Sequence, residues 1–193
     1  MDSVYDEFVE KFLKEISKYK IGDPDNRETK IGPIARFDLF LKLKDQVIRA
    51  VESGAKLLNS TLDQVDQIDY EISQGNFFKP LIITDIPRSC SVNKEELFGP
   101  AVSLYRVNTH EEALHLANET EFGLGASVFT KDMQKAQHFA KNIDCGMVFI
   151  NTSTFSDPNI PYGGSKNSGY GRTSAWEAFY EFSNHKVVAT KIN

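Results

Sequence analysis

Residues 102–150 read VSLYRVNTHEEALHLANETEFGLGASVFTKDMQKAQHFAKNIDCGMVFI, in which three short apolar stretches alternate with two amphipathic ones. The apolar stretches are rich in Val, Phe and Ile and are typical of strands: 102–107, 126–130 and 147–150. The first amphipathic stretch opens with Thr109 and has Glu112 at the capping-box position, which indicates a helix start. This succession of strands and helices predicts parallel strands joined by right-handed crossovers, and therefore an α/β fold.

Two further helices are predicted before this run, because apolar residues there recur at helical spacing. The first opens at Ser3, with Asp6 at the capping-box position, and ends before the Gly-Asp-Pro sequence at 22–24. The second runs from about Arg36 to Glu52 and is closed by a Ser-Gly pair. Short strands are predicted at three more places: 55–58, 77–84 and 186–190.

The polar stretch 63–74 receives no firm structure and is the best candidate for a weak domain boundary. The chain has no internal repeats, no low-complexity tracts and no convincing linker. We therefore expect an α/β architecture in which a largely parallel sheet is flanked by helices.

The composition is ordinary for a soluble globular chain, with 40% hydrophobic and 25% charged residues among 193. The formal net charge of −5 argues against a nucleic-acid partner, because nucleic acids favour basic surfaces. No apolar run is long enough to span a bilayer, and the acidic first residues do not resemble a secretory signal. The two cysteines and four histidines lie at spacings typical of neither disulfides nor zinc sites, so we expect a reduced, cytoplasmic protein without a metal.

Two motifs carry the functional signal. Residues 160–172 read IPYGGSKNSGYGR, where glycines let the backbone turn sharply or approach a ligand closely. This loop is either a phosphate cradle or a connector that packs on its own tyrosines, and the cradle is disfavoured because the dinucleotide fingerprint needs a third glycine and a preceding strand. Residues 95–100 read EELFGP and form either an acidic connector or a carboxylate acceptor for a ligand hydroxyl, for instance on a ribose.

Neither cysteine is a strong candidate for a nucleophile. Cys90 is expected to be exposed beside Arg88, a cation that could lower its pKa, but no histidine lies nearby in the sequence. Cys145 precedes a predicted buried strand and is expected to be inert. No Ser-His-Asp arrangement stands out either, so the residues alone indicate no covalent catalysis.

Taken together and in this order, the motifs resemble those of the aldehyde dehydrogenase superfamily. Residues 95–100 resemble its Glu-Glu-Ile-Phe-Gly-Pro motif, and 161–172 resemble its Pro-Phe-Gly-Gly-x-Lys-x-Ser-Gly-x-Gly-Arg motif. Residues 121–130 and 146–151 also match, and 3–8 resemble the helix that follows the catalytic strand in that family. The resemblance covers essentially the whole chain and looks closest to succinate-semialdehyde dehydrogenases.

The resemblance implies an enzyme that oxidises a small aldehyde to a carboxylic acid with NAD or NADP. By motif position, Glu96 would accept the nicotinamide-ribose hydroxyls and Phe98 would pack beside the nicotinamide. Asn151 opens the loop that walls the substrate funnel, and Tyr162, where the family usually has Phe, would line the aldehyde pocket. Ser156 occupies the position that holds the substrate carboxylate in succinate-semialdehyde members, and a simple turn hydroxyl is the alternative interpretation.

The resemblance also implies that some catalytic parts lie outside this chain. In the family, the nucleophilic Cys lies shortly upstream of the helix that Ser3 opens here, and the cofactor domain and general-base Glu lie further upstream. We therefore expect no catalytic residue in this chain, no NAD or NADP bound by it alone, and no activity alone. Thr173 also stands where the family commonly has Glu, which puts a proton relay there in doubt.

Two functions are favoured at this point, and a phosphate binder built on the glycine loop is a third, less favoured one. The chain is either the carboxy-terminal part of an NAD(P)-dependent aldehyde dehydrogenase, or a non-catalytic, self-associating remnant of one. The expected domains are an incomplete catalytic domain at 1–185 and an oligomerisation strand at 186–193. The expected partners are a small aldehyde and either a second copy in a dimer, joined through the strand at Lys186–Thr190, or the upstream half of the enzyme; neither nucleic acid nor a membrane is expected.

Overall fold

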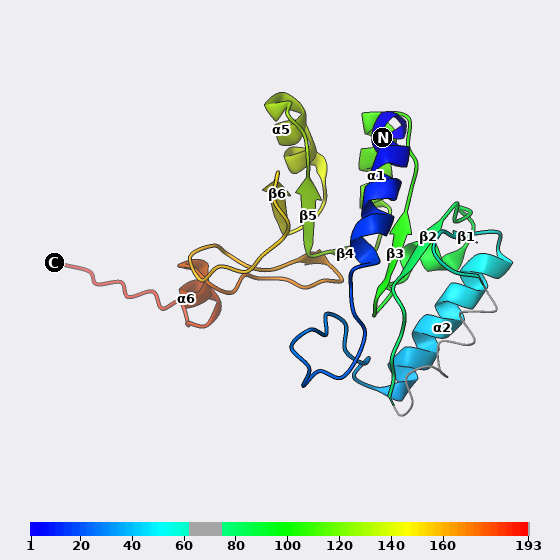
Figure 1. Cartoon of the computed structure of the whole chain (residues 1–193). Coiled ribbons are helices and arrows are strands. Elements are labelled where there is room, and N and C mark those ends of the chain that lie inside the picture. Colours follow the sequence, from blue (N-terminus) through cyan, green and yellow to red (C-terminus); the bar gives the residue numbers. More distant parts are fainter. Residues whose placement is uncertain (62–74, 193) are drawn as a thin grey trace. The chain divides into compact units, whose positions relative to one another are not determined.

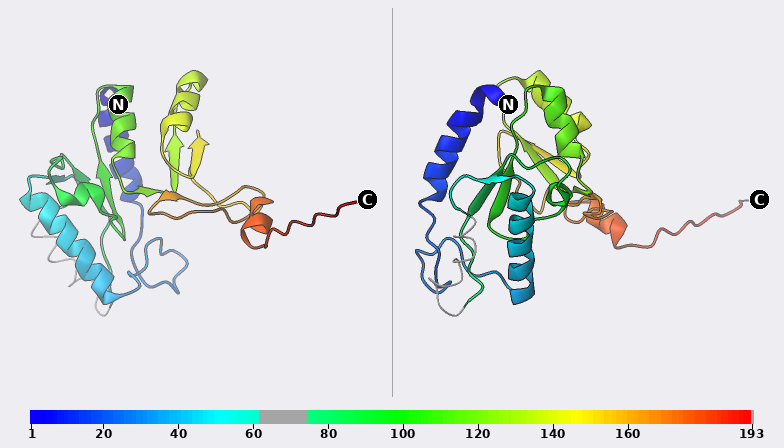
Figure 2. Two further views of the ribbon diagram at one scale, coloured as in Figure 1. Left: turned by 180° about the vertical axis from the view of Figure 1, so that it is seen from behind. Right: turned by 90° about the vertical axis from the view of Figure 1, so that its right-hand side faces the viewer.

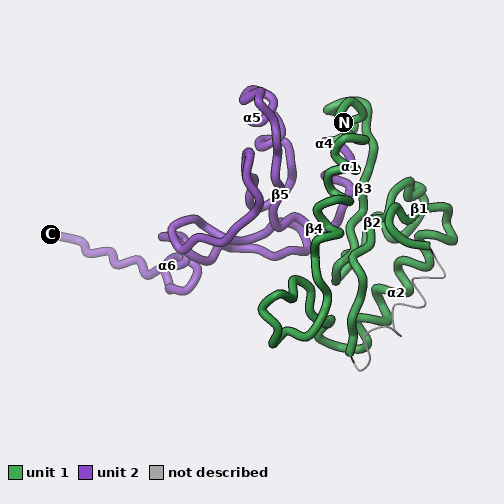
Figure 3. The backbone as a smooth tube through the Cα atoms, viewed as in Figure 1, with its two compact units in different colours: residues 1–113 green, residues 114–193 purple. Residues whose placement is uncertain are grey.

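The structure is a computed structural model that describes residues 1–61 and 75–192 (Figure 1). These residues form two compact units, Met1–Ala113 and Leu114–Asn193 (Figure 3). The weak boundary predicted at 63–74 lies outside the described residues. The division between the two units lies inside helix α4 (His110–Asn118).

Among its described residues, and besides the start of α4, unit 1 contains two long helices, one short 3-10 helix and a three-stranded sheet: α1 (Asp2–Ile16), α2 (Phe37–Glu52), η1 (Ser91–Lys94), β1 (Lys56–Leu57), β2 (Leu81–Thr84) and β3 (Ala101–Leu104) (Figure 2). The central strand β2 runs parallel to β3 and antiparallel to β1. The helix predicted from Arg36 to Glu52 is confirmed almost to the residue. Strand β2 is shorter than predicted, because pairing starts only after Pro80, which has no backbone N–H to donate.

The core of unit 1 lies where α2 packs against β2. One face of α2 is buried at helical spacing through Phe40, Leu43, Val47 and Ala50, and all four residues of β2 are buried. Phe40 meets Phe78 edge to face, with ring centroids 5.8 Å apart. Each such side chain contributes about 1.5–3 kcal/mol through burial, so this core fixes α2 beside the sheet.

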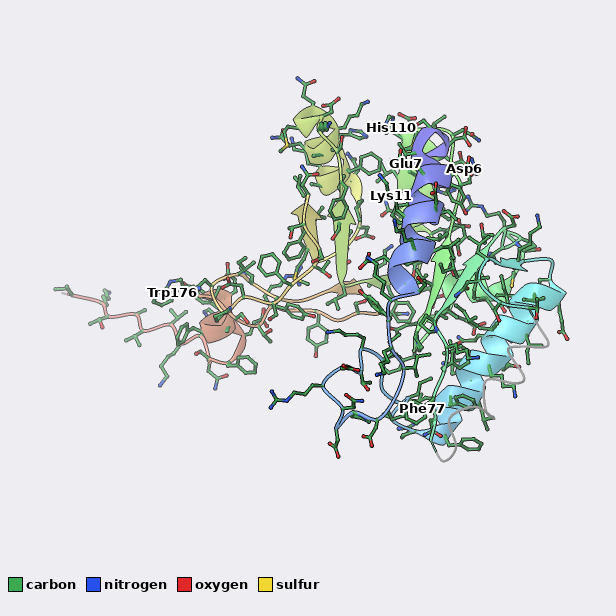
Figure 4. All side chains as sticks on the ribbon, viewed as in Figure 1. Asp6, Glu7, Lys11, Phe77, His110 and Trp176 are labelled. Atoms are coloured by element: carbon green, nitrogen blue, oxygen red, sulfur yellow. The ribbon has the colours of Figure 1, made fainter. Side chains whose placement is uncertain are left out.

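Helix α1 starts without the predicted capping box. No side chain caps it, and the Asp6 carboxylate pairs instead with Arg106, which also binds Asp2 at 2.6 Å. The Arg106 guanidinium lies 4.1 Å from the centroid of the Tyr5 ring. A charge-assisted pair with a residue remote in sequence thus outcompetes the local cap, a result that sequence spacing does not reveal. Figure 4 shows Asp6 on α1.

Unit 2 contains the end of α4 and six further elements: β4 (Phe122–Gly123), β5 (Gly125–Val128), α5 (Met133–Asn142), β6 (Met147–Ile150), β7 (Ser165–Lys166) and α6 (Glu177–Glu181). Strands β5 and β6 are parallel, and β4 and β7 are antiparallel. The predicted strand at 147–150 matches β6 at both ends. The start of α4 is also confirmed, since Thr109 Oγ accepts from Glu112 N at 3.0 Å and the Glu112 carboxylate accepts from Asn108 N at 2.8 Å.

The described strands form two parallel pairs, β2 with β3 and β5 with β6, in separate sheets. This mixture of helices and parallel pairs is consistent with the α/β class. A single, largely parallel sheet that includes both pairs stays a prediction.

The carboxy-terminal segment 184–192 forms no helix or strand within the chain. Val187 and Val188 are 92% and 80% exposed, and Trp176 at the start of α6 is 76% exposed. A β-prone segment needs the edge of another strand before it forms a ladder. The oligomerisation strand predicted at 186–190 therefore stays a prediction.

Two kinds of feature are absent from residues 1–61 and 75–192. No helix there combines the length and apolar character needed to cross a membrane. No group of three or more His, Cys, Asp or Glu side chains there is arranged to hold a metal ion.

Candidate functional site

The motif at 95–100 lies in unit 1 between η1 and β3, and its side chains alternate in direction. Glu95 and Leu97 are half-buried, Glu95 against α2 and Leu97 against the core of unit 1, whereas Glu96, Phe98 and Gly99 are exposed. A Cβ on Gly99 would lie 2.6 Å from the Leu43 side chain, so the backbone approaches α2 closely at this point. The backbone is extended at Glu95 and turns at Phe98, where Gly99 N donates to Leu97 O at 2.9 Å, and both predicted cofactor residues lie on the exposed side.

Glu95 is held by side chains of α2. The Arg49 guanidinium binds its two carboxylate oxygens at 2.9 Å each, and Gln46 Nε2 donates to it at 2.8 Å. The hydrogen bonds from Arg49 lower the pKa of Glu95 to about 2, although partial burial opposes this shift. The Glu95 carboxylate is therefore ionised, and it is already hydrogen-bonded to side chains of α2.

Glu96 and Phe98 are available to a ligand. The Glu96 carboxylate accepts no hydrogen bond from the residues that the structure describes, while its backbone carbonyl accepts from Gln46 Nε2 at 3.1 Å. The Phe98 ring is 58% exposed. An exposed carboxylate beside an exposed aromatic ring suits a ligand that offers hydroxyls and a planar ring. Neither residue lines the cavities of about 410 and 270 Å³ that lie beside α1 in the same unit.

In unit 2, the loop that follows β6 starts at a fixed point. Asn151 has a φ of 56°, in the left-handed region that Asn tolerates. Its side chain accepts from Thr130 N at 2.8 Å and donates to Thr130 O at 2.9 Å. Asn151 N also donates to Val128 O at 2.9 Å, so Asn151 ties the start of the loop to the end of β5 and to the residues just after it.

The glycine loop at 160–172 is closed at its neck by backbone contacts. Tyr162 and Thr173 exchange two backbone hydrogen bonds of 2.8 Å, and Thr173 Oγ donates to Tyr162 O at 3.2 Å. Arg172 donates to the carbonyls of Gly164 at 3.0 Å and Gly171 at 2.7 Å. Arg172 thus holds the loop closed. Tyr170 is fully exposed and cannot supply the packing expected of a connector that packs on its own tyrosines.

The closed loop brings the two predicted substrate residues to one cavity. Ser156 and Tyr162 both line a cavity of about 330 Å³ in unit 2. The remaining lining residues are Leu124, Gly125, Met147, Thr154 and Phe155. The cavity therefore offers three hydroxyl groups among apolar side chains and has the size of a small-molecule site.

Neither cysteine is placed as a nucleophile. Cys90, which was predicted to be exposed beside a cation, is in fact 7% exposed and packs in the core of unit 1. That prediction was wrong because the turn before η1 folds onto α2 and β2, a tertiary contact. Cys145 is half-buried and its Sγ donates to Met147 O at 3.0 Å, and burial raises the pKa of its thiol.

Several site residues were missed in the sequence. Thr154 and Phe155 line the cavity beside Ser156, but a loop without periodicity gave no signal for them. Gln46 gave a signal that could have been used, because it is a polar residue on the otherwise apolar face of the helix predicted at 36–52. Arg49 follows one turn later.

The chain belongs to the aldehyde dehydrogenase family, whose pattern it matches over residues 1–188. It is 37% identical over 185 residues to succinate-semialdehyde dehydrogenase [NADP(+)] 1 of Mycobacterium ulcerans; the match covers 96% of this chain and 39% of that protein. The chain thus spans about 39% of the length of such curated relatives.

Solved structures are similar too. Succinic semialdehyde dehydrogenase from Streptococcus pyogenes, in complex with NADP+, superposes with a TM-score of 0.86 at 32% identity, covering 98% of this chain and 40% of that one. Betaine aldehyde dehydrogenase from Staphylococcus aureus, in complex with NAD+, superposes with a TM-score of 0.81 at 30% identity, covering 94% and 36%. Both nicotinamide cofactors therefore occur among structural relatives.

Proposed function

We propose that this chain is the carboxy-terminal part of an NAD(P)-dependent aldehyde dehydrogenase that oxidises succinate semialdehyde to succinate. The observation that carries the proposal is the cavity shared by Ser156 and Tyr162. The names of relatives such as the Mycobacterium ulcerans protein support the same aldehyde, and the family membership supports the reaction class.

In this proposal the cavity in unit 2 binds the aldehyde. The hydroxyls of Ser156, Thr154 and Tyr162 donate to the carboxylate of the substrate, and the apolar side chains of Met147 and Phe155 contact its methylene groups. The tie between Arg172 and the two glycine carbonyls keeps the loop, and with it Tyr162, against the cavity.

The proposed cofactor residues are Glu96 and Phe98. Glu96 accepts hydrogen bonds from the ribose hydroxyls next to the nicotinamide, and Phe98 packs beside the nicotinamide ring. The support is that the carboxylate has no partner among the described residues and that the ring is largely exposed. When bound, NAD or NADP supplies the hydride acceptor for the oxidation.

We further propose that the chain does not catalyse the reaction by itself. Oxidation through a thioester needs an activated thiolate, and Cys90 is buried while Cys145 has a raised pKa. The nucleophile and the cofactor domain would come from a part of the enzyme that corresponds to the rest of the relatives' length. Both cysteines are free, which suits a reducing compartment, and we place the assembled enzyme in the cytoplasm.

The second candidate is a non-catalytic, self-associating remnant of the family. It is favoured by the exposed apolar side chains near the carboxy terminus, on α6 and in the segment after it: Trp176, Phe179, Phe182, Val187, Val188 and Ile192. A second copy would cover them if Lys186–Thr190 formed an intermolecular strand. A monomeric mass by light scattering at micromolar concentration would contradict this association.

A complementation experiment separates the two functions. The purified chain is mixed with the amino-terminal part of a succinate-semialdehyde dehydrogenase relative, and NADPH formation is followed with succinate semialdehyde as substrate. We expect turnover in the mixture, with a raised KM for the aldehyde in Ser156→Ala and Tyr162→Phe. As a control, the relative's own carboxy-terminal part is added to the same amino-terminal part. If that control restores turnover and the mixture with this chain shows none, the enzyme proposal is overturned and the remnant is supported.

A further inference from the structure

The side chain of Gln46 is an unusual member of the core of unit 1. It lies on the buried face of α2 between Leu43 and Val47 and is 1% exposed. A buried amide is costly unless its hydrogen-bonding groups are paired. The pairs that Gln46 makes therefore indicate what holds it in the core.

Gln46 directs its amide nitrogen at the acidic motif. Nε2 donates to the Glu95 carboxylate at 2.8 Å and to the backbone carbonyl of Glu96 at 3.1 Å. A single side chain thus holds the carboxylate of one residue and the backbone of the next. These contacts fix the positions of Glu95 and of the Glu96 backbone relative to α2.

Arg49, one turn further along α2, completes the grip. It binds Glu95 through both terminal nitrogens at 2.9 Å and Ser91 Oγ at 2.7 Å, and its Nε donates to Asp45 at 2.8 Å. The planar guanidinium favours such a two-point geometry with a carboxylate. Glu95 is consequently bound on two sides, by Arg49 and by Gln46.

The grip matters because two glutamates stand next to each other. In extended backbone, neighbouring side chains point in opposite directions, so only one of the two can face outward at a time. A slip of one residue would place Glu96 against Gln46 and Arg49 and would present Glu95 instead. The sequence of the motif alone does not decide which carboxylate is presented.

We propose that Gln46 and Arg49 are positioning residues that capture Glu95 and thereby present Glu96 to the nicotinamide cofactor. This inference rests on the proposed function for its cofactor, but the capture itself is a property of the isolated chain. Gln46 and Arg49 do not touch the ligand in this account and act only through the motif.

The first test uses the full chain and needs no activity. Amide hydrogen exchange is compared among the parent chain, Gln46→Leu, Arg49→Met and Arg36→Met, the last being an exposed arginine at the start of the same helix. We expect the amides of Glu95 and Gly99, which donate to Val92 O and Leu97 O, to exchange about tenfold faster in the first two variants, as for one lost charge-assisted hydrogen bond, and to be unchanged in Arg36→Met. If the amides of the β2–β3 ladder exchanged faster by the same factor, the variants would be generally destabilised and the proposed role of Gln46 and Arg49 would be overturned.

The second test uses the chain combined with the amino-terminal part of a relative. We expect Gln46→Leu to raise the KM for NADP+ about tenfold while kcat and the aldehyde KM change less than about twofold. Glu96→Gln should add no further loss in the Gln46→Leu background, and Arg49→Lys should lose less than Arg49→Met. Additive losses, or a fall in kcat alone, would overturn the positioning role.

The two tests separate failure of this inference from failure of the proposed function. If the combined parent chains never turn over, the proposed enzyme fails, while the exchange pattern still decides whether Gln46 and Arg49 hold the motif. If the combination is active and the exchange pattern is flat, the enzyme stands and the capture is rejected.

Discussion

The two motifs of this chain hold their exposed residues by different physical means. In unit 1, the residues at 95–100 are fixed by side chains, through the ion pair between Arg49 and Glu95 and the amide of Gln46. In unit 2, the loop at 151–173 is fixed at backbone groups. Side chains of Asn151 and Arg172 bond the backbone of Thr130 and of the loop glycines, and the backbones of Tyr162 and Thr173 bond each other. The first motif should therefore respond to charge and pH, and the second to any atom that crowds its backbone.

The largest effect is expected at Gly146, just before β6, where the backbone meets the glycine loop at Gly163. A Cβ on Gly146 would lie 1.9 Å from the carbonyl oxygen of Gly163, a backbone atom that cannot swing aside. We expect Gly146→Ala to lower the free energy of unfolding of unit 2 by about 3 kcal/mol or more, measured in urea.

Gly169→Ala is the matched control in the same loop. Gly169 has a φ of 132° but nothing within 4 Å of an added Cβ, so only backbone strain is introduced. We expect a loss of about 1 kcal/mol. Equal losses for the two variants would show that crowding of the backbone is not what holds the loop.

The next effect concerns the charged grip in unit 1. We expect Glu95→Gln to cost about 1.5–3 kcal/mol at pH 7, because charge-assisted hydrogen bonds to Arg49 and Gln46 are weakened. The pKa of Glu95 is about 2 in the folded chain against an ordinary 4.5. The stabilisation is therefore fully present above about pH 4.5, declines as the pH falls, and is lost near pH 2.

Urea unfolding of the parent chain and Glu95→Gln across this pH range checks the prediction. Glu7→Gln is the control, because it removes the same charge from an exposed pair with Lys11 on α1 (Figure 4). We expect no resolvable change in the control. If the difference in unfolding free energy between the parent chain and Glu95→Gln stayed constant from pH 7 to about pH 2, the stabilising role of the ionised Glu95 carboxylate would be contradicted.

A smaller effect than that of Glu95→Gln is expected for Asn151→Gly, at the start of the loop in unit 2. Asn151→Gly keeps the left-handed backbone without strain but removes both hydrogen bonds to Thr130, so we expect a loss of about 1–2 kcal/mol. Asn151→Ala adds strain at a φ of 56° and should lose about 1 kcal/mol more. Equal stability of the parent chain and Asn151→Gly in urea would mean that the side-chain ties do not hold the loop.

The sequence predicted the local elements better than their contacts. The helix at 36–52, the strand at 147–150 and the cap at Thr109 are determined by neighbouring residues, and the structure confirms them. The exposure of Cys90 and the cap at Ser3 were wrong, because burial against α2 and the pairing of Asp6 with Arg106 join residues far apart in the chain.

The same distinction applies to the candidate site. Motif positions led to Glu96, Phe98, Ser156 and Tyr162, and the structure turns the first two outward and joins the last two at one cavity. The supporting contacts were not predictable, because Gln46 and Arg49 are about fifty residues from Glu95 in sequence.

The measurement that tests the central claim most directly is NADPH formation from succinate semialdehyde by this chain combined with the amino-terminal part of a relative. We predict no turnover by the chain alone, turnover by the combination, and a KM for the aldehyde that is raised about tenfold in Ser156→Ala. Turnover by the chain alone would contradict the claim. So would a silent combination in a preparation where the relative's own carboxy-terminal part restores activity.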